Sequence, residues 1–321
     1  MATANAQPKT EIAPGRMRPP RRDRGLRLHL PPVEQLDLTG RKLVVVGGTA
    51  GLGRAIASAA VSRGARVTVV GRTFREAPSV RLSFVPADLS SMREAVRLGR
   101  ELPVEDSDLL LLTTGTFAGR VREETAEGLE RDMAVSFLSR LAVLRELAGR
   151  LGSARTEKSF RPRVFVMGSP GWGELGTITD LNTEGDYKAM KAHGNTVAGN
   201  EALALAGDSR FPGPAFFGMA PAVIRTDIRA NFLGDGTGVH RVTETLIGLL
   251  AQSAESYARR MVPLLFAPDL EGRSGDLFGR NGDPIRPSRG FDKDYALRFL
   301  TESEALLDRA LADGRPAPLQ Q

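Results

Sequence analysis

The sequence predicts an α/β protein: a doubly wound parallel sheet with helices on both faces, in a single domain with a C-terminal extension. From residue 42 onward, short apolar runs rich in β-branched residues alternate with longer segments of helical period, and this alternation is typical of such a sheet. The chain has 321 residues. A chain near this length buries about 75% of its unfolded surface, so it needs neither disulfides nor a structural metal.

The first strand and the first helix give the clearest pattern. Residues 42–46 read Lys-Leu-Val-Val-Val, which is typical of a buried strand. After a glycine-rich turn, five apolar residues recur with the spacing of one helical face: Leu52, Ala55, Ile56, Ala59 and Ala60. We expect this helix to end at Gly64.

The remaining elements follow in the same alternation. Further strands are expected at 66–70, 82–85, 108–112, 163–167 and 214–218. Helices are expected to begin near Ser91, Glu127, Tyr187 and Val239, and a last helical pattern covers 295–311. We therefore expect three parts: a disordered Arg/Pro-rich tail at 1–36, the α/β domain at 37–285, and a C-terminal helix and tail at 286–321 that packs on the domain or trails from it.

The basic charge of the chain is concentrated at the N-terminus. Residues 1–32 carry seven basic and two acidic residues, and so account for five of the six net positive charges. Six prolines and few apolar residues accompany them, a composition that predicts disorder. Because the folded part is then nearly neutral, we do not expect a nucleic-acid partner.

Composition also excludes several classes of protein. There is no cysteine, and the three histidines (His29, His193 and His240) are too scattered for a metal site, so we expect no metal. The sequence has neither a secretory apolar core nor an apolar run of about 18 residues. We expect a cytoplasmic protein without a membrane span.

A glycine-rich turn joins the first strand to the first helix. Gly47, Gly51 and Gly53 allow positive φ and a close backbone approach to a pyrophosphate, which then lies on the free N–H groups of the helix. This arrangement is Rossmann-like. Arg72 follows the second strand, where an arginine neutralises the 2′-phosphate of NADP and an acidic residue would instead bind the ribose of NAD. We therefore predict NADP(H).

From about Leu38 to Gly282 the chain resembles the short-chain dehydrogenase/reductase superfamily. The resemblance rests on the glycine turn, Asp88-Leu89, Thr114-Gly115, Gly168-Ser169 and the segment Pro221 to Asp227. The long interval between Ser169 and the tyrosine, with Asp180-Leu-Asn182 inside it, is most similar to the retinol-dehydrogenase-like branch. Carried over to this chain, the resemblance implies that the cofactor contacts are Gly47, Thr49, Gly51, Leu52, Gly53, Arg72, Asp88, Leu89, Thr114, Gly115, Pro221, Val223 and Thr226.

The resemblance implies a reaction, namely hydride transfer between the nicotinamide and a carbonyl or alcohol carbon. In the family a tyrosine transfers the hydroxyl proton, a lysine lowers the pKa of that tyrosine and holds the ribose, a serine orients the substrate oxygen, and an asparagine supports a water relay. Ser169 matches the serine. Tyr187 and Lys191 match the tyrosine and lysine literally, and on a helix this spacing would place both on one face.

A second register competes with this one. In the retinol-dehydrogenase-like pattern the catalytic tyrosine comes six residues later, at His193, and the lysine position becomes Val197. The asparagine position, counted through residues 133–136, is Ser136. The sequence leaves both registers open, so Ser169, Tyr187, Lys191, His193 and Ser136 are all candidate catalytic residues.

Two functions follow from these patterns. The first is an NADP(H)-dependent oxidoreductase acting on a small, partly apolar molecule, since the segment from Pro221 to about Val242, where the resemblance implies a lid over the substrate, is partly apolar. The second is a related protein whose catalytic tetrad has degraded, with non-redox catalysis or a binding role. The resemblance also allows a homodimer or homotetramer.

Overall fold

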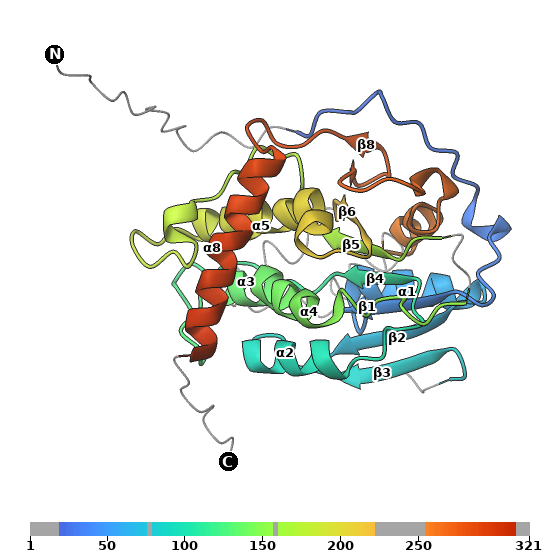
Figure 1. The fold of residues 1–321 in the computed structure, drawn as a ribbon, viewed down its shortest axis with the longest axis horizontal. Helices are drawn as coiled ribbons and strands as arrows, with labels where there is room; N and C mark the ends of the chain where they lie inside the picture. Colours follow the sequence, from blue (N-terminus) through green and yellow to red (C-terminus); the bar gives the residue numbers. More distant parts are fainter. Residues whose placement is uncertain (1–18, 76–78, 157–159, 222–253, 313–321) are drawn as a thin grey trace, which may run out of the picture.

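A computed structural model of the chain describes residues 19–75, 79–156, 160–221 and 254–312. A mostly parallel sheet of eight strands organises the fold, in the order β3-β2-β1-β4-β5-β6-β7-β8. β3 lies at one edge and β8 at the other (Figure 1). The strands are β1 Lys42–Val46, β2 Arg66–Gly71, β3 Leu82–Pro86, β4 Leu109–Leu112, β5 Arg163–Met167, β6 Ala215–Met219, β7 Leu277–Phe278 and β8 Pro284–Ile285. The predicted doubly wound α/β fold is confirmed.

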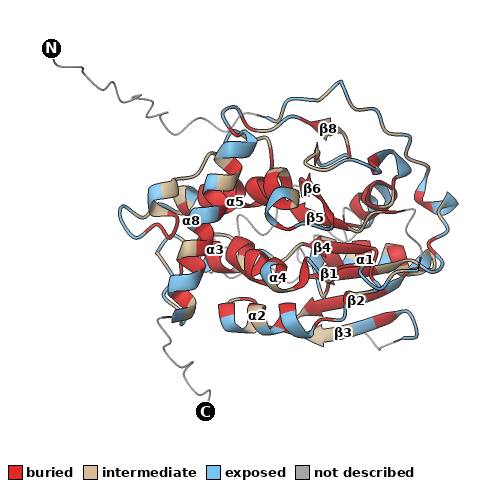
Figure 2. Cartoon of the chain, in the orientation of Figure 1, coloured by how far each residue is buried: buried red, intermediate tan, exposed pale blue. Residues whose placement is uncertain are grey.

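Alternate residues of the central strands pack against opposite helical layers. In β1, Leu43 and Val45 belong to the core that contains Ile56 of α1 (Gly51–Ser62) and Met261 of the helical stretch 254–265. Val44 and Val46 instead face the helices α2 (Met92–Glu101), α4 (Ser139–Leu147), α5 (Ala189–Arg210) and α8 (Lys293–Ala312). The sheet is therefore buried on both faces, and buried residues run through its centre (Figure 2).

Local signals fix several helix ends. The side chain of Ser91 accepts a hydrogen bond from the Glu94 backbone at 3.4 Å and caps α2, as expected for a helix that begins near Ser91. Gly64 has φ +100° just after α1, which is the left-handed geometry of a helix end.

One expected helix start is wrong. No helix begins at Glu127, because its carboxylate accepts the Met92 backbone N–H at 2.9 Å and so binds the start of α2, while Gly128 turns with φ +74°. The helix α3 (Arg131–Met133) follows and continues into a π-helical turn, η2 (Ala134–Leu138), and then into α4. The helix α5 begins at Ala189, as expected for a start near Tyr187, but Tyr187 itself precedes the helix. The expected helix near Val239 lies outside the described residues.

The segment 19–36 contacts the body, contrary to the disordered tail expected there. The Asp23 N–H donates to the Pro284 carbonyl at 2.9 Å, beside β8, and the His29 N–H donates to Asp269 at 2.7 Å. Val33 is buried in the short 3₁₀ helix η1 (Val33–Gln35). Figure 1 shows the segment running along one side of the molecule. Main-chain pairing and a few apolar contacts, which composition does not reveal, give it this place; residues 1–18 lie outside the described part.

The C-terminal helix α8 packs across α5. Phe299 of α8 lies 6.0 Å from Phe137 between ring centroids, and Glu304 pairs with Arg210 at the end of α5 at 2.5 Å. Within the described ranges, no helix is long and apolar enough to cross a membrane.

Candidate functional site

The glycine turn after β1 leaves the start of α1 open. A Cβ atom on Gly53 would lie 2.5 Å from the Gly47 carbonyl oxygen, and one on Gly47 would lie 2.5 Å from the Thr114 nitrogen, so both positions require glycine. Gly51 has φ +56° and open space around its Cβ position. No side chain caps the first N–H groups of α1. The turn therefore has the free backbone N–H donors that a dinucleotide pyrophosphate requires, and it lacks side chains that would keep the pyrophosphate away from the backbone.

The predicted adenosine end lies where β2 and β3 finish. Arg72 follows β2 and is exposed, and the side chain of Thr49 fills the space beside Gly71. Asp88, also exposed, accepts hydrogen bonds from the Ser90 backbone at 3.0 Å and the Ser90 hydroxyl at 2.8 Å. Part of its role is therefore to stabilise the turn before α2. Leu89 is buried.

Some of the other predicted cofactor residues lie within the described part of the chain. Thr114 and Gly115 follow β4, whose carboxyl end is next to that of β1. Leu52 lies in the first turn of α1 and Pro221 follows β6. Val223, Thr226 and the expected lid lie outside the described residues.

Tyr187 and Lys191 do not form a pair. Tyr187 precedes α5, so the helical spacing that would place both residues on one face does not apply. The Tyr187 hydroxyl donates to the Gly119 carbonyl at 2.9 Å, and Lys191 pairs with Asp180 at 2.7 Å. Burial and the nearby carboxylates of Glu130 and Asp132 raise the pKa of Tyr187 to about 12. A proton-transferring tyrosine needs the opposite shift.

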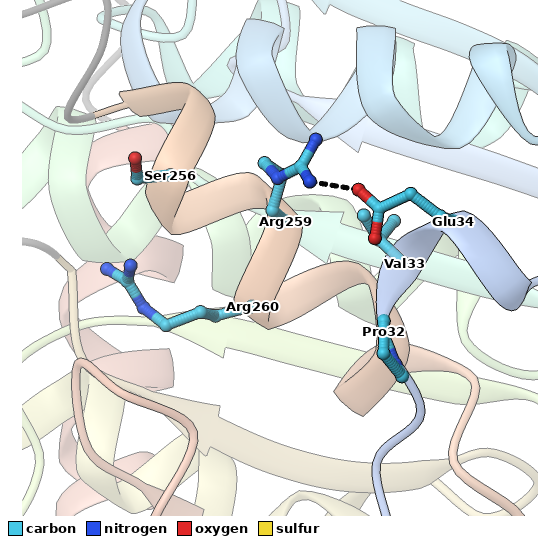
Figure 3. A pocket seen from close by; sticks show the side chains of 6 residues that line it. All are labelled: Pro32, Val33, Glu34, Ser256, Arg259 and Arg260. Carbon is cyan, nitrogen blue, oxygen red and sulfur yellow. Dashed lines mark ion pairs between the residues drawn. The ribbon is translucent and has the colours of Figure 1, made fainter.

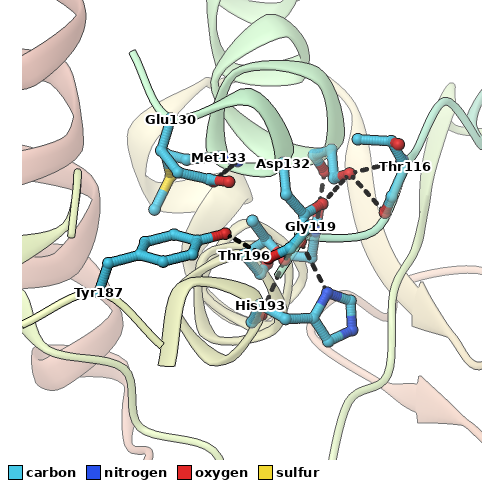
Figure 4. Close-up of polar contacts among 10 residues, drawn as sticks. Thr116, Gly119, Glu130, Asp132, Met133, Tyr187, His193 and Thr196 are labelled. Atoms are coloured by element: carbon cyan, nitrogen blue, oxygen red, sulfur yellow. Dashed lines mark hydrogen bonds and ion pairs between the residues drawn. The ribbon is translucent and has the colours of Figure 1, made fainter. Parts of the chain in front are cut away.

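His193 lies in the first turn of α5 and faces a different set of groups. Its Nδ1 lies 2.7 Å from Oδ2 of Asp132, and Phe117 stacks on the imidazole with ring centroids 4.0 Å apart. Figure 4 shows the second ring nitrogen pointing away from Asp132, while Tyr187 points to Gly119 from another side. A side chain of Gly194 would collide with the carboxylate of Glu174, because its Cβ would lie 2.9 Å from that oxygen. Burial raises the pKa of Glu174, and the charge of His193 opposes that shift.

Two asparagines hold α3 and α5 in this arrangement. Asn182 accepts the Glu130 backbone N–H at 2.7 Å and so fixes the start of α3. Asn195 donates to the carbonyls of Asp180 and Leu181, both at 3.0 Å, and so ties the preceding loop to α5. The loop therefore sets Asp132 opposite His193.

Ser136 lies in the π-helical turn η2. Its hydroxyl accepts the Thr116 backbone N–H at 2.9 Å and donates to Asp132 at 2.5 Å (Figure 4). Ser136 therefore connects the loop after β4 to the buried carboxylate.

Ser169 follows β5 and is half-buried. Asn200, two turns along α5 from His193, packs against the neighbouring Gly168, where an added Cβ would lie 2.8 Å from that of Asn200. Val197, which replaces the lysine in the second register, is buried.

Arg140 of α4 ties the ends of β4 and β5 together, and sequence reasoning missed it. Its guanidinium donates to the carbonyls of Thr114 at 2.5 Å and Met167 at 2.6 Å, and to Asn200 at 2.6 Å. Burial lowers the pKa of Arg140 to about 9, and the Asp132 carboxylate opposes that shift. Asp132 was missed as well, since nothing in the sequence links it to His193.

A surface pocket of ≈ 260 Å³ lies elsewhere, between η1 and the helical stretch 254–265. Figure 3 shows its lining by Pro32, Val33, Glu34, Ser256, Arg259 and Arg260. Arg259 already pairs with Glu34, and no predicted site residue lines the pocket. We therefore do not assign the chemistry to it.

Curated proteins of several organisms are similar to the chain. An uncharacterized oxidoreductase of Saccharomyces cerevisiae is 44% identical over 288 residues, covering 88% of this chain and 93% of the relative. Polyprenol dehydrogenase of Mus musculus is 28% identical, covering 74% of each chain. Retinol dehydrogenase 13 of Mus musculus is 23% identical, covering 87% of each. No protein-family model matches the chain.

Solved structures share the fold. A crystal structure from Mycobacterium paratuberculosis has a TM-score of 0.63 at 19% identity and covers 87% of this chain and 98% of that one. RhlG of Pseudomonas aeruginosa with NADP has a TM-score of 0.50 at 20% identity (77% and 97% covered). An NADH-dependent reductase with NAD has a TM-score of 0.52 at 19% identity (78% and 98% covered).

Proposed function

The chain belongs to the short-chain dehydrogenase/reductase superfamily and is an oxidoreductase of that type, and from this premise we propose that it uses NADP(H) to interconvert a carbonyl and an alcohol on a small, partly apolar molecule. The observation that carries the proposal is the glycine turn, where α1 begins with uncapped N–H groups beside Gly51. When bound there, the nicotinamide cofactor supplies or accepts the hydride. The solved neighbours include both an NADP and an NAD complex, so the family alone does not choose between them.

Arg72 supports the choice of NADP(H). It is exposed directly after β2, and the strand ends Val69-Val70-Gly71 without a carboxylate for the ribose hydroxyls of NAD. Thr49, Leu52, Asp88, Leu89, Thr114, Gly115 and Pro221 remain proposed cofactor contacts, together with Val223 and Thr226.

His193 is the proposed proton-transfer residue, with Ser169 orienting the substrate oxygen. The Tyr187 hydroxyl is bonded to Gly119 and Lys191 to Asp180, whereas His193 keeps a ring nitrogen that points away from the polar cluster. Phe117, stacked on the imidazole, gives the substrate an apolar neighbour and supports a partly apolar molecule.

One observation favours a second candidate function. In the second register the lysine position of the family is Val197, which is buried, so no cation at that position would hold the nicotinamide ribose. On this account the chain would bind NADPH without catalysing hydride transfer.

Binding and single-turnover measurements separate the two candidates. We expect calorimetric titration to give tighter binding of NADPH than of NADH. We then expect enzyme-bound NADPH, mixed with apolar ketones and aldehydes, to lose its absorbance at the nicotinamide band with at least one of them. Binding without any oxidation across the panel would favour the second candidate, and failure to bind either nucleotide would contradict both.

A further inference from the structure

Asp132 is a buried carboxylate for which the family reaction has no use. It lies in α3, and its side chain has an exposed fraction of 0%. An isolated carboxylate in such a place is costly unless hydrogen bonds and charge satisfy it. Its partners therefore indicate what it does.

The hydrogen bonds around Asp132 have a definite direction. The Ser136 hydroxyl accepts the Thr116 N–H at 2.9 Å, and its own proton has Asp132 at 2.5 Å as the nearer of two acceptors, the other being the Thr116 carbonyl at 3.3 Å. An ionised carboxylate can only accept, so Nδ1 of His193, at 2.7 Å from Oδ2, must carry a proton and donate it. Nε2 of the neutral imidazole is then the unprotonated nitrogen.

We propose that Asp132 is a positioning residue that fixes His193 in the Nδ1–H tautomer, so that Nε2 becomes the atom that transfers the substrate proton. The catalytic part of this proposal rests on the proposed oxidoreductase function. Asp132 and His193, as a couple, would take over the task of the family's tyrosine and lysine. In the second register the positions of that tyrosine and lysine are His193 and Val197.

The charges around the couple are consistent with this role. The fully buried Arg140 guanidinium attracts the Asp132 carboxylate, so the carboxylate is not left without a counter-charge. Glu174 reaches the same turn of α5, beside Gly194, and is the second carboxylate facing His193. Two acidic side chains, Asp132 and Glu174, therefore lie beside the imidazole of His193.

The proton balance is simple. In alcohol oxidation, neutral Nε2 accepts the hydroxyl proton as the carbon loses its hydride, and the imidazolium is stabilised by Asp132. In carbonyl reduction, the imidazolium donates its Nε2 proton to the oxygen as the carbon gains a hydride. His193 returns to its starting state by proton exchange with water.

The tautomer is measured directly on the cofactor-free protein. The chain has three histidines, so ¹⁵N-labelled imidazoles can be assigned by comparison with His193→Ala. At a pH where His193 is neutral, we expect Nδ1 of His193 to be protonated and Nε2 to be unprotonated. In Asp132→Asn the amide can donate to Nδ1, and we expect the proton to move to Nε2. Protonation of His193 at Nε2 in the wild type would overturn the proposal.

The rate is measured with NADPH and a carbonyl that the wild type reduces. A wrong tautomer is a poor acid and base, so we expect Asp132→Asn to lower kcat by about 10²–10⁴-fold with little change in the NADPH dissociation constant. Glu130→Gln is the matched control, because Glu130 lies two residues away, is also buried, and caps α3 by accepting the Met133 N–H at 2.8 Å, a bond that a glutamine oxygen can still accept. The control should keep kcat within about threefold.

The outcomes distinguish the two proposals. If the wild type turns over and Asp132→Asn stays within threefold of it, the positioning role is wrong and the oxidoreductase function stands. If the wild type binds NADPH but reduces nothing, the proposed function is wrong and the catalytic part of this inference falls with it. A folded Asp132→Asn variant, checked by its thermal melt, with the moved proton and the lowered kcat, supports the inference.

Discussion

The cofactor half of the candidate site is built from backbone, whereas the proton-transfer half is built from side chains of distant segments. In the first, the turn Gly47–Gly53 and the start of α1 come from one continuous stretch. In the second, Asp132 and His193 are 61 positions apart and meet because the loop before α5 is bonded to the start of α3 through Asn182 and to α5 through Asn195. Backbone sites of this kind retain the family pattern, while side-chain sites can change their chemistry by replacement of single residues.

The backbone half is most sensitive to added volume. Gly53→Val would drive a side chain against the Gly47 carbonyl, 2.5 Å from the Cβ position. Overpacking of this kind costs up to about 3 kcal/mol of free energy. Because this cost falls on the turn proposed to hold the pyrophosphate, we expect the affinity for NADPH and for NADH to fall by about 150-fold, measured by calorimetry. Gly149→Ala is the control, because its Cβ meets no atom within 4 Å. Unchanged affinity in Gly53→Val would show that the turn does not bind the cofactor.

A side chain within the cofactor half should choose between nucleotides. Arg72→Ala removes a charged hydrogen bond to the 2′-phosphate, so we expect NADPH affinity to fall by about 1–3 kcal/mol, or about 5- to 150-fold. NADH affinity should not change. Arg66→Ala, an exposed arginine at the other end of β2, serves as control. An equal loss for both nucleotides in Arg72→Ala would contradict the NADP(H) assignment.

The smallest effect is expected from the tyrosine that matches the family motif literally. Tyr187→Phe removes the hydrogen bond to Gly119, so we expect a loss of about 1 kcal/mol in unfolding free energy and a kcat within about threefold of wild type. The folded pKa of about 12 lies above the ordinary value near 10, so the folded state holds this proton more tightly. The stability that the shift contributes is present below pH 10 and is lost as the pH rises from 10 to 12.

Two measurements check this prediction. Denaturant unfolding at pH 8 and pH 11 should show the wild type losing part of its advantage over Tyr187→Phe at the higher pH. The second measurement is steady-state turnover. A 100-fold loss of kcat in Tyr187→Phe would show that Tyr187 and Lys191 are the catalytic pair after all. Lys191→Met breaks the ion pair with Asp180, and its kcat should likewise stay within about threefold of wild type.

The same comparison explains how far the sequence can be interpreted. The strand at 42–46, the glycine turn and the helix start near Ser91 were predictable because each depends on neighbours in the chain. The place of the loop before α5 was not, because Asn195 holds it through bonds to Asp180 and Leu181 rather than through a local signal. Asp132 was missed for the same reason. The place of residues 19–36 was missed because pairing with Pro284 and Asp269 outweighs their polar composition.

Chemical rescue tests the central claim most directly. In His193→Gly the imidazole is removed from between Phe117 and Asp132, and we expect single-turnover NADPH oxidation to slow by about 10²–10⁴-fold with NADPH affinity unchanged. Added imidazole should then restore the rate in proportion to its concentration, and Tyr187→Phe should show no such dependence. A His193→Gly variant that turns over at the wild-type rate would contradict the account.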